Sequence, residues 1–352
     1  MAEIDRDTLK NLQWKIMQNV AAGAIIPLMR IGDELGLFLS LAECGPCSIG
    51  DFAKHAGIDS RYAEEWILAM CAAGYCSFSE ELEEFHLSPE QEAVFAREES
   101  PALMIGAYDI LAGNVHNIEK LLPAFKSGQG VEWGNFHPCI FQGTARFFKP
   151  SYESNLLQRW LPKIPLVAEK LERGGSFLDV GCGQGISTLL IASAYPIAEI
   201  NGLDPHAPSI EKAKEAAAAS MLERVNFFVS DAESYEKSYD VIAFFDCLHD
   251  MGDPLAAAQY ARSKLKKGGV AVLIEPSASD EKAENLNIIG QMYYSFSTMG
   301  CVPASKSQKV GLALGAQAGA KKLTDIMESA GFASFEIVFK NPTNMVIACY
   351  TD

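Results

Sequence analysis

Residues 178–185 read Leu-Asp-Val-Gly-Cys-Gly-Gln-Gly and follow a short apolar run. Glycines at a junction between a strand and a helix let a ligand approach the backbone closely, because a Cβ atom would collide with it. Gly181, Gly183 and Gly185 have the spacing G-x-G-x-G. A dinucleotide-binding fingerprint would place its third glycine at position 186, where this chain has Ile186. The stretch therefore predicts a ligand-binding loop and disfavours NAD(P) as the ligand.

The segments after residue 175 alternate between strand patterns and helical patterns. Strands are expected at 176–180, 199–203, 225–229, 241–245 and 270–274, and helices at 186–194, 209–221 and 254–267. Alternating βα units predict a parallel, doubly wound sheet. Two last strands, 334–339 and 345–349, flank an Asn-Pro-Thr-Asn turn and predict an antiparallel pair that closes the sheet. The predicted class is α/β, with a Rossmann-like, seven-stranded, mostly parallel sheet.

Polar residues end two of these strands. Asp204 closes the second strand, 19 residues after Gly185, where a carboxylate can accept hydrogen bonds from both hydroxyls of a ribose. Asp231 and Ala232 follow the third strand, where a polar residue would meet an adenine amine. Since ligands of such folds bind at the carboxyl ends of the strands, these residues and the glycine loop are expected to form one site.

This set of segments resembles the class I S-adenosylmethionine (SAM)-dependent methyltransferases. The segment LDVGCGQG is similar to their first motif, and GLDP, which contains Asp204, is similar to their second. The resemblance implies SAM as cofactor and S-adenosylhomocysteine (SAH) as product. The cofactor-binding residues that it implies are Asp179, Gly181, Gly183, Gly185, Asp204, Asp231, Ala232 and Phe245, with His206 flanking the adenine. The alternative is an NAD(P)-binding or empty Rossmann-type domain.

A second segment, residues 245–253, reads Phe-Asp-Cys-Leu-His-Asp-Met-Gly-Asp. It is similar to the L-H-D-W-x-D segment of winged-helix small-molecule O-methyltransferases, such as the plant phenylpropanoid enzymes. The resemblance implies that His249 is the general base and that Glu275, after the fifth strand, orients it. The chain departs from that pattern, because the second orienting carboxylate falls at about Gln317 and the tryptophan is replaced by Met251. The other interpretation is that His249 belongs only to a polar segment at the start of a helix and has no catalytic role.

The first hundred residues predict a helix-rich domain. Helices are expected at 8–43, 51–56 and 61–73, and strands at 75–78 and 84–87, which together are typical of a winged helix. Winged helices often bind DNA through the second helix of the pair. Here Arg61 on that helix is opposed by Glu64 and Glu65, and the wing carries Glu80, Glu81, Glu83 and Glu84. Such acidity would repel phosphates, so we interpret the domain as a packing and dimerisation module and expect no nucleic acid partner.

Composition limits the possible partners and compartments. The 352 residues carry a formal net charge of −16 and no long Lys/Arg run, which disfavours phosphate backbones and anionic membranes. The amino-terminal segment lacks the features of a secretory signal, and the apolar stretch 21–29 is too short to span a bilayer. Nine scattered cysteines favour reduced thiols and a cytoplasmic location. Cys44 and Cys47 form a C-x-x-C motif, for which a Gly-Pro turn is the alternative to a redox or metal site. No metal is expected, because no His/carboxylate cluster has ligand spacing.

Three regions follow from these patterns: a winged-helix and dimerisation domain over 1–100, a helical connector and pocket cover over 101–165, and the methyltransferase domain over 166–352. Simple interdomain packing is the alternative for the connector. Residues 276–320 are interpreted as an insertion that forms part of the acceptor pocket, with a lining of Tyr293, Tyr294, Phe296 and Met299. The alternative is that these four side chains belong to the hydrophobic core.

Segments over nearly the whole chain, including MYYSFSTMGCVPASKSQKVGLALGAQAG, resemble a bacterial group of two-domain winged-helix methyltransferases. That resemblance implies a homodimer formed through the N-terminal region and a small-molecule acceptor. Two other functional classes stay open, a SAM-binding regulator without catalysis and a nucleotide-cofactor oxidoreductase, which the glycine spacing disfavours. A methyltransferase that acts on nitrogen or carbon instead of oxygen is a further alternative.

Overall fold

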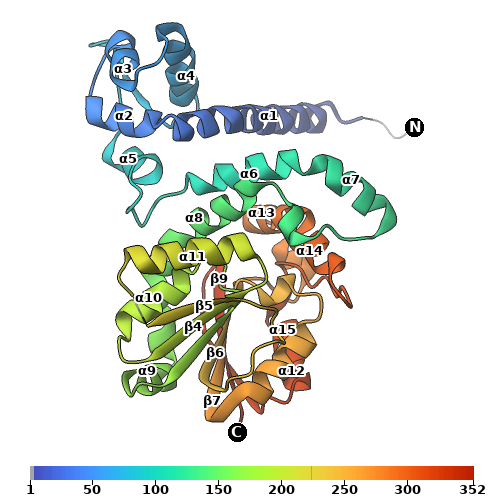
Figure 1. The fold of residues 1–352 in the computed structure, drawn as a ribbon. Coiled ribbons are helices and arrows are strands. Elements are labelled where there is room, and N and C mark those ends of the chain that lie inside the picture. Colours follow the sequence, from blue (N-terminus) through green and yellow to red (C-terminus); the bar gives the residue numbers. More distant parts are fainter. Residues whose placement is uncertain (1–3, 223) are drawn as a thin grey trace. The chain divides into compact units, whose positions relative to one another are not determined.

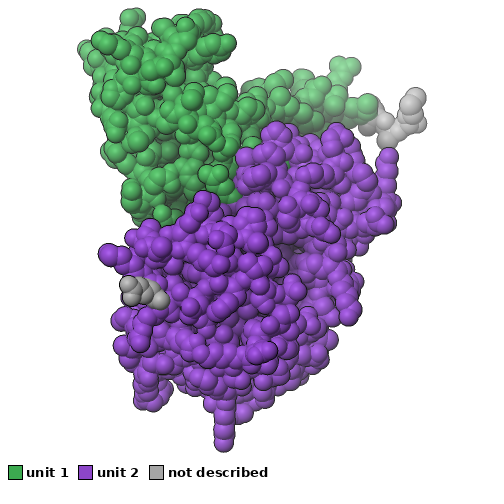
Figure 2. All heavy atoms as spheres, viewed as in Figure 1, with its two compact units in different colours: residues 1–113, 142–150 green, residues 114–141, 151–352 purple. Residues whose placement is uncertain are grey.

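The computed structural model describes residues 4–222 and 224–352. The chain divides into two compact units, coloured separately in Figure 2. Unit 1 comprises residues 1–113 and 142–150, and unit 2 comprises residues 114–141 and 151–352. Helix α8 (Pro138–Asn155) contributes residues to both units. Among the described residues, no helix is both long enough and apolar enough to cross a membrane.

Unit 1 is built from helices and one short hairpin. Its elements are α1 (Arg6–Glu34), α2 (Leu37–Cys44), α3 (Ile49–Ala56), α4 (Ser60–Ala72), β1 (Ser77–Ser79), β2 (Glu84–His86), α5 (Pro89–Phe95) and most of α6 (Gly106–His116). Trp66 on α4 is the centre of the core, since its ring contacts Phe38 at 5.0 Å and Phe52 at 5.8 Å between centroids. Its indole N–H donates to the carbonyl of Leu28 at 2.9 Å. The winged-helix prediction for this region is confirmed.

The expected single helix over residues 8–43 is wrong. Helix α1 ends at Glu34, and α2 begins at Leu37 after Gly36, whose φ is +64°. Glycine populates this left-handed region without the steric penalty of a Cβ atom, and it commonly ends a helix for that reason. The apolar spacing continues across the break, so periodicity alone did not reveal it.

The C-x-x-C motif forms the end of α2 and not the start of a redox helix. Cys44 is the last residue of α2, and Gly45 has a φ of +67°. Cys47 then exchanges two backbone hydrogen bonds with Phe85 of the hairpin, at 3.1 and 2.9 Å. Both thiols are free of disulfides. This placement agrees with the Gly-Pro turn.

Unit 2 contains a mixed sheet that, among the described residues, has seven strands in the order β5-β4-β3-β6-β7-β9-β8. The strands are β3 (Ser176–Val180), β4 (Glu199–Asp204), β5 (Val225–Val229), β6 (Tyr239–Phe245), β7 (Leu265–Pro276), β8 (Ser334–Lys340) and β9 (Asn344–Tyr350). The first five are parallel, while β9 runs antiparallel to both β7 and β8. The predicted seven-stranded Rossmann-like sheet with an antiparallel end is confirmed.

Helices cover both faces of this sheet (Figure 1). Helices α10 (Ile186–Ala194) and α11 (Ala207–Ala219) pack on one face, and α12 (Pro254–Lys264) and α15 (Gly319–Ser329) pack on the other. The larger core lies on the α12 and α15 side and contains Leu178, Phe244, Leu323 and Met327. Both faces of the central strands are therefore buried, which explains their nearly continuous apolar sequences.

One boundary in this region differs from the prediction. The helix expected to end at residue 267 ends at Lys264, because Leu265 already pairs with Tyr239 as part of β7. The predicted start is confirmed, since the Asp253 carboxylate accepts the Ala256 N–H at 2.9 Å and Pro254 is the first helical residue.

The remaining elements of unit 2 are α7 (Ile118–Ser127), α9 (Pro165–Glu172), α13 (Ile288–Phe296), α14 (Val302–Ser307), the π-helical turns η2 (Leu156–Trp160) and η6 (Ser297–Cys301), and the 3-10 turns η1 (Trp133–Asn135), η3 (Leu161–Lys163), η4 (Leu248–Asp250) and η5 (Lys282–Asn285). Two of them concern the site directly. Turn η4 follows β6, and η6 lies within the segment that was expected to be an acceptor-pocket insertion.

Candidate cofactor and catalytic site

The glycine loop joins β3 to α10, and all three of its glycines have a positive φ. A Cβ atom on Gly181 would lie 2.8 Å from the Cys247 sulfur, and one on Gly185 would lie 2.7 Å from the Phe227 ring. Packing within the protein therefore requires these two glycines. A Cβ atom on Gly183 would meet nothing within 4 Å, so Gly183 faces open space. A ligand can therefore approach the loop backbone at Gly183.

Asp204, at the end of β4, is tied to this loop. Its Oδ2 accepts the N–H of Gly183 at 3.0 Å, and its Oδ1 accepts the N–H of His206 at 2.8 Å. Burial raises the pKa of Asp204, while the two backbone hydrogen bonds act against that rise. Each carboxylate oxygen keeps a lone pair, so the group can still accept the hydroxyls of a ribose placed beside Gly183.

Asp179 lies deeper, on β3, and is fully buried. Its Oδ2 accepts hydrogen bonds from the hydroxyls of Ser187 and Thr188 on α10, at 2.6 and 2.7 Å. Its Oδ1 has no hydrogen-bond partner among the described residues. Burial raises the pKa of Asp179 to about 6. An unpartnered buried carboxylate oxygen beside a glycine loop fits the amino group of SAM, because buried polar atoms are normally hydrogen-bonded.

The residues expected at the adenine lie at the same edge of the sheet. Asp231 follows β5 and is exposed, and Ala232 packs against the larger core. The His206 ring lies 4.2 Å from the ring of Phe141, between centroids, and its Nδ1 is 2.8 Å from the Ser209 hydroxyl. Burial lowers the pKa of His206. Phe141 belongs to no motif, so its place beside these residues comes from the tertiary structure alone.

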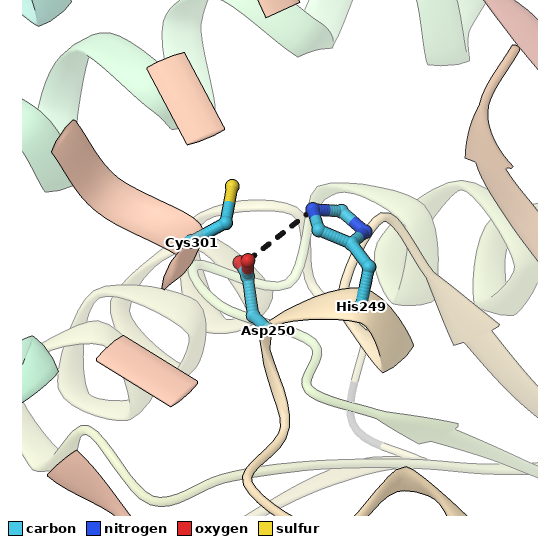
Figure 3. A group of neighbouring side chains, drawn as sticks. All are labelled: His249, Asp250 and Cys301. Carbon is cyan, nitrogen blue, oxygen red and sulfur yellow. Dashed lines mark ion pairs between the residues drawn. The ribbon is translucent and has the colours of Figure 1, made fainter. Parts of the chain in front are cut away.

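His249, in turn η4, is held between two carboxylates. The residue is 4% exposed, and Nδ1 of its ring hydrogen-bonds Oε2 of Glu275 on β7. The other oxygen of Glu275 accepts the Leu248 N–H at 3.0 Å, which fixes the carboxylate. His249 Nε2 lies 3.2 Å from Oδ1 of Asp250, as the dashed line in Figure 3 marks. Burial acts to lower the pKa of His249, but Asp250 and Glu275 outweigh it and raise that pKa well above its usual value.

The second carboxylate at His249 is therefore Asp250, its neighbour in the chain. Gln317, expected near that place, donates its amide hydrogen to the carbonyl of Ala316 at 3.0 Å. The chain thus has an amide where the resemblance implied a second carboxylate, and Asp250 belongs to the same motif as His249.

Cys301, at the end of η6, completes the group drawn in Figure 3. Ligand atoms of His249, Asp250 and Cys301 all lie within 4.8 Å of one another. Burial raises the pKa of the Cys301 thiol to about 11. Imidazole, carboxylate and thiol are donor types that divalent metals accept. Spacing in the sequence did not show this group, because Cys301 lies 51 positions after Asp250.

Two further residues were not found by sequence reasoning. Asp246 follows the last residue of β6, Phe245, which is buried. Tyr152 on α8 donates its hydroxyl hydrogen to Oδ2 of Asp246 at 2.5 Å. Asp246 stands inside the quoted motif, but nothing in its neighbours pointed to Tyr152, 94 residues away.

The aromatic side chains expected in the acceptor pocket divide into different environments. Tyr293 is buried and donates its hydroxyl hydrogen to the Thr343 carbonyl at 3.1 Å. Tyr294 is exposed, whereas Phe296 and Met299 are half-buried. Tyr293 lies close enough to Asp246 and His249 for their charges to affect its pKa, which burial raises. Among the four, Tyr293 is thus shown to lie near the candidate base.

The parallel sheet, the glycine loop after β3, Asp204 at the end of β4 and the histidine after β6 are the features that the sequence predicted for a Rossmann-like methyltransferase domain. A model of the methyltransferase domain family matches residues 152–334, which is more than half of the chain. The chain therefore belongs to the methyltransferase domain family. A model of the Rv2258c-like winged HTH domain matches residues 23–97.

Curated relatives match part of the chain. Trans-aconitate 2-methyltransferase of Methylobacterium radiotolerans is 31% identical over 128 residues, which is 36% of this chain and 45% of the relative. Malonyl-[acyl-carrier protein] O-methyltransferase 1 of Ilyobacter polytropus is 31% identical over 109 residues, 30% of this chain and 40% of the relative. The chain spans about half the length of the curated relatives it matches, or less.

Solved structures share the fold over nearly the whole chain. Human N-acetylserotonin methyltransferase, in complex with SAM, has a TM-score of 0.70 and 16% identity, and the match covers 99% of each chain. An O-methyltransferase family protein from Burkholderia thailandensis has a TM-score of 0.69 and 13% identity, covering 99% of this chain and 98% of that one. At such identities the likeness concerns the fold.

Proposed function

We propose that the chain transfers the methyl group of SAM to a hydroxyl oxygen of a small molecule. The observation that carries this proposal is the position of His249. It follows the strand next to the glycine loop, Glu275 hydrogen-bonds its Nδ1, and its Nε2 lies 3.2 Å from Asp250 without a hydrogen bond to that carboxylate. The solved O-methyltransferases of the same fold support oxygen as the acceptor atom.

The cofactor supplies an electrophilic methyl group on a positively charged sulfur. The chain's residues would bind and orient it through the Gly183 backbone, Asp204 and Asp179. His249 Nε2 would take the proton of the acceptor hydroxyl as the oxygen–carbon bond forms and the carbon–sulfur bond breaks. Glu275 is then a positioning residue, since its carboxylate hydrogen-bonds the Leu248 N–H and Nδ1 of the ring, the nitrogen that does not take the acceptor proton. A positioned base of this kind contributes about 10²- to 10⁴-fold to the rate.

The test is ligand-dependent stabilisation. SAM and SAH should each raise the melting temperature of the protein, because a ligand that binds only the folded state stabilises it. NADH, at the same concentration, should leave the melting temperature unchanged. A screen of small-molecule alcohols and phenols with methyl-labelled SAM then identifies the acceptor. Stabilisation by NADH, or by none of the three compounds, would contradict the proposal.

A regulator that binds SAM and DNA is the second candidate, and the winged HTH match is the observation in its favour. Arg61, at the start of α4, is paired with Glu64 and Glu65. A guanidinium that neutralises two carboxylates has little charge left for a phosphate backbone, so we propose a packing role for this unit. Salt-sensitive DNA binding without methyl transfer would favour the regulator instead.

The absence of disulfides among the nine cysteines supports a cytoplasmic enzyme.

We also propose a homodimer formed through unit 1. Helix α1 leaves Leu12, Ile16 and Val20 exposed by 53–60%, and their spacing places them on one face. Apolar patches of this kind mark interaction sites. Light scattering should report twice the mass of one chain, and the double variant Leu12→Glu/Ile16→Glu should report one. A variant that stays dimeric would place the interface elsewhere.

A further inference from the structure

Asp246 occupies a strained and closely fixed position directly after β6. Its φ is +50°, in the left-handed region that residues with a side chain rarely adopt. Its N–H donates to the Ile274 carbonyl of β7 at 2.7 Å, so the neighbouring strand holds the backbone there. Such conformations persist where the surrounding structure enforces them, and they gather at functional sites.

Only one of the two carboxylate oxygens of Asp246 has a hydrogen-bond partner among the described residues. Oδ2 accepts the hydroxyl hydrogen of Tyr152, but Oδ1 is buried and has no hydrogen-bond partner among the described residues. Burial raises the pKa of Asp246 to about 7, against the effect of the Tyr152 hydrogen bond. Glu275 and Asp250 add negative charge nearby, and His249 is the cation that opposes them. A buried, partly unsatisfied carboxylate is costly unless a positive partner joins it.

The same carboxylate lies near both the glycine loop and the candidate base. Cys247, the next residue, donates its thiol hydrogen to the Val180 carbonyl at 2.9 Å and lies against Gly181 of the glycine loop. His249, the candidate base, follows Asp246 by three residues and lies close enough for its charge to lower the pKa of that carboxyl. In an in-line methyl transfer the sulfur and its methyl group lie between the cofactor loop and the base. A carboxylate near both the loop and the base would lie near the positively charged sulfur.

We propose that Asp246, held by Tyr152, is a specificity-determining residue that favours the positively charged sulfonium of SAM over the neutral thioether of SAH. The proposal rests on the function proposed above. When the methyl group leaves, the sulfur loses its charge and the attraction to the carboxylate ends. The residue would thus favour binding of the substrate form of the cofactor and release of the product form. The ammonium group, which both compounds carry, is assigned to Asp179 instead.

The experiment compares dissociation constants for SAM and SAH by calorimetry, in the wild type and in three variants. Asp246→Asn keeps the shape of the side chain and removes its charge. We expect it to weaken SAM binding about tenfold or more, as for a lost charged hydrogen bond, and SAH binding by less than about threefold. Asp179→Asn is the matched control, also a buried aspartate, and should weaken both ligands by similar factors. Tyr152→Phe should lower the SAM preference in the same direction, because the carboxylate loses the donor that favours its ionised form.

The outcomes distinguish the role of Asp246 from the proposed function of the protein. Equal losses for SAM and SAH in Asp246→Asn, or no loss, would overturn the role of Asp246. A wild-type protein that binds neither ligand would instead refute the proposed function. Thermal unfolding of each variant without ligand shows whether it folds. If Asp246→Asn does not, Tyr152→Phe decides, and an unchanged ratio of the two dissociation constants in that variant counts against the proposal.

Discussion

His249→Asn is expected to lower kcat by about 10²- to 10⁴-fold while leaving the dissociation constant of SAM nearly unchanged. The change removes the proton acceptor but keeps a polar side chain of smaller size at a buried position. The measurement is single-turnover methyl transfer with the acceptor found in the screen, together with SAM binding by calorimetry. A kcat within about threefold of the wild type would mean that His249 only belongs to a polar segment at the start of a helix and is not the base.

The pH dependence gives a sharper test of the same residue. A base must be unprotonated to act, and the carboxylates of Asp250 and Glu275 raise the pKa of His249 well above its usual value. The rate should therefore rise with pH through that raised pKa, and the acid limb of the profile should lie above the range of an ordinary histidine. Glu275→Gln and Asp250→Asn each remove a carboxylate that holds the proton, so each should move the limb to lower pH. A limb that stays in place in both variants would assign it to another group.

Asp204→Ala is expected to weaken SAM binding by at least about 100-fold and to abolish the thermal shift. The carboxylate organises the loop through the Gly183 N–H and would also accept the ribose hydroxyls. Hydrogen bonds to a charged group contribute about 1.5–3 kcal/mol each, so the loss of two accounts for this factor. The measurement is calorimetric titration with SAM.

Asp231→Ala is the control for that experiment, because this exposed aspartate also follows a strand at the same edge of the sheet. With a single expected contact to the adenine, it should lose about tenfold. Thermal unfolding without ligand shows whether Asp204→Ala has merely disordered the loop. Unchanged SAM affinity in a folded Asp204→Ala protein would remove Asp204 from the site.

The sequence alone was sufficient for the sheet and for the glycine loop. Continuous apolar strands, the helices between them and the turn at 341–344 carry local signals, and all seven strands were found, although β7 begins at Leu265, five residues before its predicted start. The break at Gly36 and the early end of α12 were missed. The first depends on the backbone conformation of a single residue, and the second depends on the strand pairing of a single residue. Apolar periodicity encodes neither.

The sequence by itself determined the fold class, the family resemblance and those site residues that stand in one motif, because their positions follow from chain order at the ends of parallel strands. Only the tertiary structure decided which partners these residues have. It placed Asp250 and Cys301 at His249, Phe141 at His206, and Tyr152 at Asp246. It also showed that Gly181 and Gly185 serve packing while Gly183 faces open space. The contacts of Cys301, Phe141 and Tyr152 join residues far apart in the chain, and the other features depend on side-chain orientation or atomic clearances, so they arise only in the folded protein.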